Sequence, residues 1–195
     1  MRLIAGLGNP GTSYAATRHN IGFTILNRLA ELHSVSWKDG FRGEYAQITV
    51  KDSGCFLLKP MTYMNNSGES VGALCGYYKI KPADMLLIHD ELDLPYGSIK
   101  FSINGSGGGH NGVDSVISHL GARDFCRLRM GVAGISRAEM RGYTKDYVLA
   151  AFTAEERESL GGFTALGAEA AAFTAENGVR KAMEKYNGKI NRRQT

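Results

Sequence analysis

The chain has 195 residues, a formal net charge of +4 and a hydrophobic fraction of 43%, the size and composition of one soluble globular domain. No apolar run is long enough to cross a membrane, and residues 3–5 are too short for the apolar part of a signal peptide, so we expect a cytoplasmic protein. The basic charge is compatible with an anionic partner. The three cysteines, Cys55, Cys75 and Cys126, lack metal-ligand spacing and are expected to be unpaired thiols in a reducing compartment.

Apolar runs and helical periodicities alternate through the first half of the chain. The elements expected there, in order, are a strand at 3–7, a polar loop to about residue 20, a helix at 21–32, a hairpin of strands at 44–50 and 55–58, a helix capped by Asn65 or Asn66 that ends before Pro82, and a strand at 85–88. The strand at 85–88 is apolar throughout, which is typical of the centre of a sheet.

The second half continues the alternation. The expected elements are a strand at 98–103, a helix at 113–120, a strand at 127–132, an Ala-rich helix at 152–173 and a helix at 178–186. Thr153 and Glu156 form a capping-box pattern at the start of the Ala-rich helix. Because helices and strands interleave without a repeat or a long linker, we predict one α/β domain over 1–187, with a twisted mixed sheet covered by helices on both faces. The basic tail 188–195 is expected to be frayed.

Polar residues follow several of these strands in Gly-rich loops. In open α/β sheets, ligands bind at the carboxyl ends of the strands, so these loops are expected to form one site. The segments concerned are Gly6-Leu7-Gly8-Asn9-Pro10-Gly11, Thr17-Arg18-His19-Asn20, Met61-Thr62-Tyr63-Met64-Asn65-Asn66-Ser67-Gly68, His89-Asp90-Glu91-Leu92-Asp93-Leu94-Pro95 and Gly107-Gly108-Gly109-His110-Asn111-Gly112.

Together, and in this order, the segments closely resemble the bacterial peptidyl-tRNA hydrolases, over nearly the whole chain from Arg2 to about Asn187. The resemblance implies hydrolysis of the ester between a peptide and the 3′-terminal ribose of tRNA, with no metal or other cofactor, by a monomer. It implies that His19 is the general base, that Asp90 orients its ring, and that Asn9 distinguishes peptidyl-tRNA from aminoacyl-tRNA. Burial of the charged amine of an aminoacyl group would cost more than burial of a neutral amide.

The resemblance also implies a set of contacts to the substrate. Carboxamides can hydrogen-bond the peptide backbone because they both donate and accept, and tyrosine rings can stack on the end of the tRNA. Lys100 and Arg129 match positions that contact tRNA phosphates, and Arg127 lies two residues away on the same strand face. The substrate-side residues expected from the resemblance are Tyr14, Asn20, Tyr63, Met64, Asn65, Lys100, His110, Asn111 and Arg129.

Other interpretations apply to single motifs. Gly6 to Gly11 matches a dinucleotide-binding pattern, but no helix pattern opens within the glycines; their expected role is a sharp turn that presents Asn9. His19, Asp90 and His110 could bind a metal, although their spacing does not favour it. Asn65 and Asn111 could be helix caps, and residues 105–109 could be a linker, an anion-binding nest or a mobile loop; we expect the mobile loop.

Two whole-chain alternatives remain at this point. One is an RNA-binding relative without activity, which the intact His19 and Asp90 oppose. The other is a small-molecule esterase, opposed by the basic charge and by the lack of a nucleophile elbow.

The sequence departs from the family's common pattern at three places. Ser102 and Asp114 stand where the family often has basic residues, which removes positive charge from the expected RNA path. Residues 134–141 lack the usual Pro/Gly-rich character, so the lid-like segment up to Leu149 is expected to behave differently.

Overall fold

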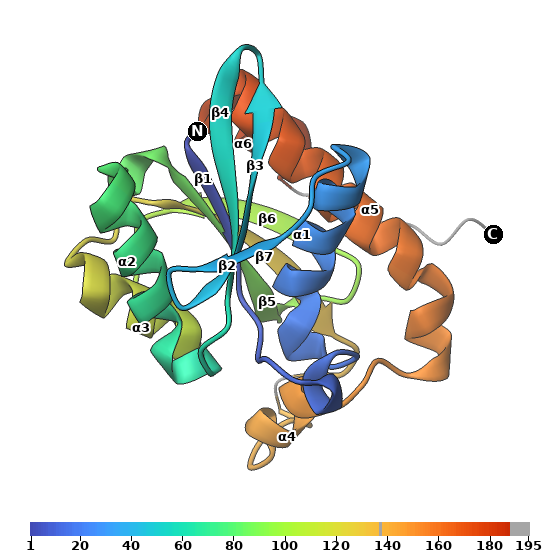
Figure 1. Cartoon of the computed structure of the whole chain (residues 1–195). Coiled ribbons are helices and arrows are strands. Elements are labelled where there is room, and N and C mark those ends of the chain that lie inside the picture. The colour runs from blue at the N-terminus through green and yellow to red at the C-terminus, as the bar shows by residue number, and fades with distance from the viewer. Residues whose placement is uncertain (137, 188–195) are drawn as a thin grey trace.

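A twisted sheet of seven strands runs through the centre of the computed structural model (Figure 1), which describes residues 1–136 and 138–187. Four central strands are parallel to one another, and the three outer pairings are antiparallel. In spatial order the strands are β2 (Lys38–Gly40), β3 (Gly43–Val50), β4 (Ser53–Pro60), β1 (Leu3–Gly6), β5 (Met85–Pro95), β7 (Cys126–Ala133) and β6 (Ile99–Ile103). The parallel strands β4, β1, β5 and β7 therefore all end at the same edge of the sheet.

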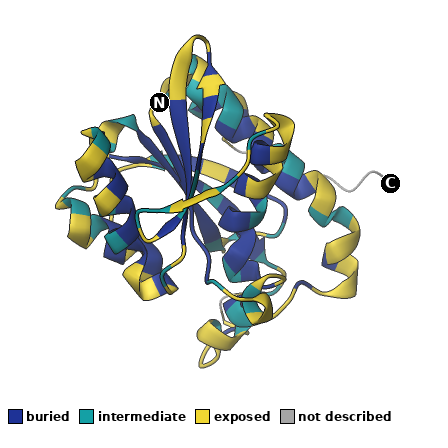
Figure 2. Ribbon diagram, viewed as in Figure 1, coloured by how far each residue is buried: buried dark blue, intermediate teal, exposed yellow. Residues whose placement is uncertain are grey.

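Helices cover both faces of the sheet, as the sequence predicts (Figure 1). One face carries α1 (Ile21–Leu32), α5 (Ala154–Asn177) and α6 (Val179–Tyr186), and the other carries α2 (Ser67–Tyr78) and α3 (Asn111–Leu120). Successive residues of β5 are buried on opposite faces: Leu86 and Ile88 in the α1/α5 layer, Met85 and Leu87 in the α2/α3 layer. The middle of the sheet is consequently buried (Figure 2), and residues 3–6 of β1 and 85–88 of β5, which are covered on both faces, are apolar.

The glycines after β1 serve close packing of a helix. A Cβ at Gly6 would lie 2.4 Å from the Gly22 carbonyl oxygen, and one at Gly22 would lie 2.4 Å from the Leu7 nitrogen. Helix α1 can therefore approach the end of β1 only because both positions lack side chains. This corrects the sharp turn expected at Gly6 and Gly8, because in the glycine loop only Gly11 has a positive φ, +100°. The helix begins at Ile21, well after the glycines, as the sequence indicates.

The remaining predicted elements are present, with four differences. The short edge strand β2 and the helix α4 (Thr144–Leu149) were not predicted. Strand β5 continues through residue 95 rather than ending at 88, and α5 continues to Asn177. The capping box at Thr153 and Glu156 is confirmed. The predicted tail 188–195 lies outside the described residues.

The three cysteines are unpaired and buried, as expected for core thiols. Burial raises the pKa of Cys55 and Cys126 to about 12 and that of Cys75 to about 11. Within the described part of the chain, no helix combines the length and apolar character that a bilayer crossing requires.

Candidate active site

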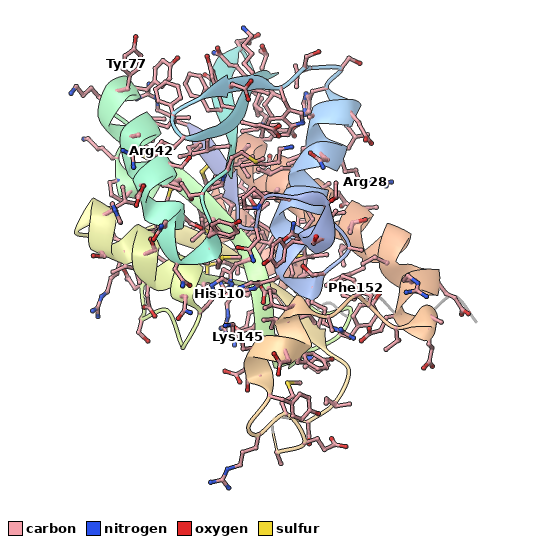
Figure 3. The ribbon with its side chains drawn as sticks, turned by 60° about the horizontal axis from the view of Figure 1, so that its bottom comes forward. Arg28, Arg42, Tyr77, His110, Lys145 and Phe152 are labelled. Atoms are coloured by element: carbon pink, nitrogen blue, oxygen red, sulfur yellow. The ribbon has the colours of Figure 1, made fainter. Side chains whose placement is uncertain are left out.

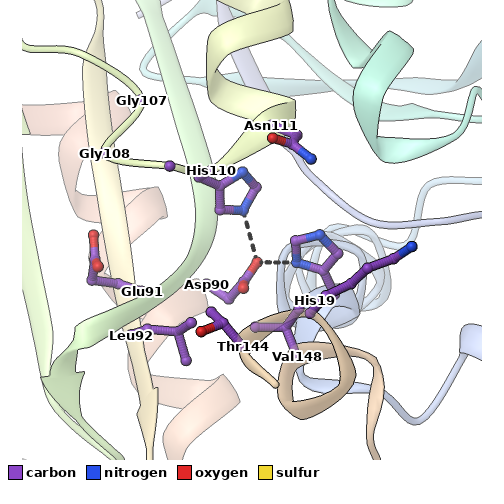
Figure 4. Close-up of a pocket in the computed structure, with 12 residues that line it drawn as sticks. His19, Asp90, Glu91, Leu92, Gly107, Gly108, His110, Asn111, Thr144 and Val148 are labelled. Carbon is purple, nitrogen blue, oxygen red and sulfur yellow. Dashed lines mark hydrogen bonds and ion pairs between the residues drawn. The ribbon is translucent and has the colours of Figure 1, made fainter. Parts of the chain in front are cut away.

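Two histidines share one carboxylate oxygen at the carboxyl edge of the sheet. His19 Nδ1 lies 2.8 Å and His110 Nε2 2.9 Å from Asp90 Oδ1 (Figure 4). Asp90 was predicted to follow its strand, but it lies inside β5, because the chain keeps its extended pairing with β7 past Ile88. A strand holds the carboxylate more rigidly than a loop would.

The protonation of this cluster follows from its hydrogen bonds. An ionised carboxylate can only accept, so both ring nitrogens that face it carry a proton, which leaves Nε2 of His19 unprotonated in the neutral ring. Burial alone would raise the pKa of Asp90, but His110 and His19 outweigh it and hold this pKa far below its ordinary value.

His110 is subject to opposing influences. Burial lowers its pKa, but the charge and hydrogen bond of Asp90 outweigh burial and raise it. The ring also caps α3, because its Nδ1 accepts a long hydrogen bond of 3.4 Å from the Val113 N–H, which favours the neutral form. The contact with Asp90 is the shorter and involves a full charge, so it dominates.

His89, which the sequence did not identify as a site residue, contacts the backbone of Asp90. Its Nδ1 donates to the Asp90 carbonyl oxygen over 2.7 Å, and its ring lies edge-on to that of His110 with centroids 4.8 Å apart. Burial, followed by the charge of His110, lowers the pKa of His89 to about 3. His89 is therefore neutral at physiological pH and does not add charge to the site.

A cavity of about 350 Å³ opens at this cluster. Figure 3, turned to bring this end forward, shows His110 and Lys145 near each other there. The sequence marked a lid-like segment up to Leu149, but not which residues would reach the site. The lining residues are His19, Asp90, Glu91, Leu92, Gly107, Gly108, Gly109, His110, Asn111, Thr144, Lys145 and Val148.

A buried arginine connects the end of α4 to the 3₁₀ turn that carries His19. Arg18 donates to the carbonyl oxygens of Ala150 and Ala151 over 3.3 and 2.7 Å and to Glu156 Oε2 over 2.6 Å. Its guanidinium also lies 4.3 Å from the centre of the Tyr147 ring. The capping-box pattern identified Glu156, but nothing in the sequence connects it with Arg18, 138 positions away.

The asparagines near β1 form a second cluster beside His19. Asn20 holds the backbone of Asn9 with both ends of its carboxamide, accepting from the Asn9 N–H and donating to its carbonyl oxygen, each over 2.9 Å. Asn9 in turn accepts the Met64 N–H over 2.8 Å with its side-chain oxygen. Asn20 and Met64 are both buried. Among the described hydrogen bonds, the Nδ2 group of Asn9 has no acceptor.

The other residues that are expected to contact the acyl end and the tRNA end of the substrate are more exposed than Asn9 and Asn20. Tyr14 and Tyr63 meet edge to face with ring centroids 6.5 Å apart, and Tyr63 is 62% exposed. Asn65 is exposed in a 3₁₀ turn, and Asn111 is exposed at the first turn of α3. Neither is a helix cap: Asn66 occupies the cap position of α2 without a side-chain hydrogen bond, and His110 caps α3.

The predicted phosphate contacts lie on the neighbouring strands. Lys100 of β6 pairs directly with Arg129 of β7 in the antiparallel ladder, so the two side chains project from the same face. Arg129 donates from Nε to Glu91 over 2.8 Å, which ties it to the wall of the cavity. Arg127, in contrast, is buried and bound to the loop at Gly105 and Ser106.

The carboxylate and its two histidines could also bind a metal ion. Ligand atoms of His19, Asp90 and His110 all lie within 4.8 Å of one another, closer than their sequence spacing indicated. Both histidine nitrogens nevertheless face the same Asp90 oxygen at hydrogen-bond distance. A metal in their place would require those nitrogens to lose their protons and both hydrogen bonds to break.

Comparisons with known proteins find similar sequences and structures over most of the chain. The profile of the family described as peptidyl-tRNA hydrolase matches residues 3–194. The peptidyl-tRNA hydrolase of Desulfitobacterium hafniense is 44% identical over 187 residues, which cover 96% of this chain and 100% of that protein. That of Bacillus cytotoxicus is 48% identical over 157 residues, 80% of this chain and 83% of that protein. The crystal structure of peptidyl-tRNA hydrolase from Acinetobacter baumannii has a TM-score of 0.88 at 34% identity, covering 97% and 96% of the two chains.

Proposed function

Since the chain belongs to the peptidyl-tRNA hydrolase family, we propose that it hydrolyses peptidyl-tRNA with His19 as general base and without a metal ion. The activity is that of a carboxylic ester hydrolase, which cleaves the bond between the peptide carboxyl group and the terminal ribose of tRNA. The observation that carries the mechanism is the hydrogen bond between His19 and Asp90 at the cavity. It fixes one ring nitrogen as donor and leaves the other to act on water.

The reaction follows from this arrangement. Nε2 of His19 removes a proton from a water molecule as the water oxygen attacks the ester carbonyl carbon. The imidazolium that forms is stabilised by Asp90, and it returns the proton to the ribose oxygen as the carbon–oxygen bond breaks. The products are a peptide with a free carboxylate and a tRNA with a free hydroxyl group. The reaction thereby recycles peptidyl-tRNA that is dropped from or released by ribosomes during translation.

The carboxamides hold the acyl end of the substrate. Asn9 has its oxygen engaged by Met64, so its Nδ2 group is the donor left for the peptide or the developing oxyanion. Asn65 and Asn111 are exposed and can bind the peptide backbone. Asn20 and Met64, which are also predicted to contact substrate, are buried and hydrogen-bond Asn9, so they position it.

The tRNA is held mainly through its phosphates, by Lys100 and Arg129, while Tyr14 and Tyr63 pack against its 3′ end. Contacts of this type fix the orientation of the nucleic acid without selecting its sequence. The protein works as a monomer in the cytoplasm.

Loss of a phosphate contact should weaken the binding of every tRNA equally. For Lys100→Ala, the slope of log K against log salt should fall by roughly one. Binding of several uncharged tRNAs at a series of salt concentrations measures this. Lys81→Ala is the matched control, because Lys81 is exposed before the amino end of β5, whereas the site lies at the carboxyl ends of the parallel strands. A loss restricted to one tRNA would indicate base recognition and contradict the assignment.

Removal of divalent and transition metals should leave the rate unchanged within about twofold, because the proposed base acts directly on water. Hydrolysis of peptidyl-tRNA is measured before and after prolonged dialysis against a chelator, and again after addition of Zn²⁺, Mn²⁺ or Mg²⁺. Loss of activity that one of these ions restores would assign His19, Asp90 and His110 as metal ligands and overturn the mechanism.

A simple acyl ester, tested in parallel, shows whether the tRNA part of the substrate is needed for hydrolysis.

A further inference from the structure

The loop of residues 105–109, between β6 and α3, forms one wall of the cavity. It ends at His110, whose ring donates to Asp90. The conformation of this loop therefore decides where His110 lies relative to the carboxylate. We expected a mobile loop from its glycines, but two side chains from other elements hold it.

Arg127 holds the first part of the loop from β7. Its Nη1 donates to the Ser106 carbonyl oxygen over 2.6 Å, and its Nη2 donates to the Gly105 carbonyl oxygen over 2.5 Å. The residue is only 5% exposed, and its guanidinium lies 5.2 Å from the centre of the Phe125 ring. Arg127 is thus committed to the backbone of the loop, although it shares a strand face with the phosphate contact Arg129.

Asp114 holds the next residue of the loop from the first turn of α3. Its Oδ1 accepts the Gly107 N–H over 3.0 Å. A Cβ at Gly107 would lie 2.3 Å from that same oxygen, so the contact requires glycine. Gly108 and Gly109 follow with φ values of +62° and +86°, a conformation that brings the chain round to His110 and that other residues adopt only with strain.

We propose that Arg127 and Asp114 are positioning residues that fix the loop 105–109, so that His110 holds Asp90 in the orientation that His19 needs. The three consecutive residues 105, 106 and 107 are each anchored by one of these two side chains. This gives Asp114, which stands where the family often has a basic residue, a role inside the protein. It also means that Arg127, unlike Arg129, is not assigned as a contact to RNA.

The inference rests on the proposed roles of His19 and Asp90. The kinetic measurements depend on those roles, whereas the hydrogen-exchange measurement does not. Asp114→Ala and Arg127→Gln should each lower kcat about tenfold, because small displacements of catalytic groups are costly. KM and the salt dependence of tRNA binding should be unchanged. Asp114→Asn, whose amide oxygen can still accept the Gly107 N–H, should recover most of kcat. Arg123→Ala removes an exposed neighbouring charge and should keep wild-type kcat.

The direct readout is hydrogen exchange at the loop amides, measured without substrate. The Gly107 amide should exchange at least about tenfold faster in Asp114→Ala than in the wild type, because its acceptor is lost. Unchanged exchange would overturn the proposal even if His19 proves to be the base. If Arg127→Gln instead keeps kcat, raises KM and lowers the salt slope by roughly one, Arg127 is a phosphate contact and the proposal is wrong.

Discussion

His19→Ala is expected to lower the rate of peptidyl-tRNA hydrolysis by at least about a hundredfold, the usual contribution of a positioned general base. The imidazole lies in a short 3₁₀ turn, Arg18–Asn20, with 13% of its side chain exposed. Its one described hydrogen bond is to Asp90, which keeps His110 as a partner. The variant should therefore fold normally and bind tRNA with wild-type affinity.

Three measurements test this expectation: single-turnover hydrolysis, the melting temperature and the binding of uncharged tRNA. His33→Ala is the matched control, because His33 is an exposed histidine at the end of α1, outside the site. A hundredfold loss with unchanged melting and binding supports a chemical role for His19. Turnover close to that of the wild type would show that another group, or a metal ion, activates the water.

Much of the fold could be predicted because each element carries its own pattern. Residues 3–6 of β1 and 85–88 of β5 are apolar, as strand segments covered on both faces must be, and the alternation of Leu86 and Ile88 with Met85 and Leu87 serves two separate cores. Helix α1 is recognisable from its apolar spacing, and α5 from its capping box. Local patterns of this kind do not depend on the rest of the chain.

The features that sequence patterns missed depend on contacts between distant segments. Arg18 gives no sign in the sequence that it binds Glu156 and the end of α4. Arg127 lies on an alternating strand like Arg129, and only the path of the loop decides that one is buried and the other half-exposed. The extension of β5 past Ile88 is polar in sequence, and its pairing with β7 keeps it extended.

The candidate site was predictable as a set of residues, but not as a geometry. The motifs, through their resemblance to a known family, marked His19, Asp90 and His110, but not that both histidines would donate to one oxygen. They also marked Asn20 as a contact for substrate, but not that its carboxamide would hold the backbone of Asn9. Residue identity shows which chemistry is available, and the packing of loops decides which atoms remain free to perform it.

Asp90→Asn should lower the plateau of the kcat/KM profile by at least about a hundredfold. In the wild type, the pKa of Asp90 is held far below its ordinary value. Its carboxylate is therefore charged throughout an assay range of about pH 5 to 9. Without that charge, the imidazolium that forms during the reaction loses the partner that stabilises it.

The plateau falls for a separate reason, which lies in the hydrogen bonds. Asp90 Oδ1 accepts from both His19 and His110, whereas a carboxamide has one accepting oxygen and an NH₂ group that can only donate. An asparagine that turns its NH₂ group toward His19 would require Nδ1 to accept, which moves the proton to Nε2 and removes the base. The pH–rate profile is compared with those of the wild type and of Asp124→Asn, a control at an exposed aspartate outside the site. If kcat keeps its wild-type value and only KM rises, Asp90 binds substrate and its hydrogen bond to His19 does not contribute to the chemical step.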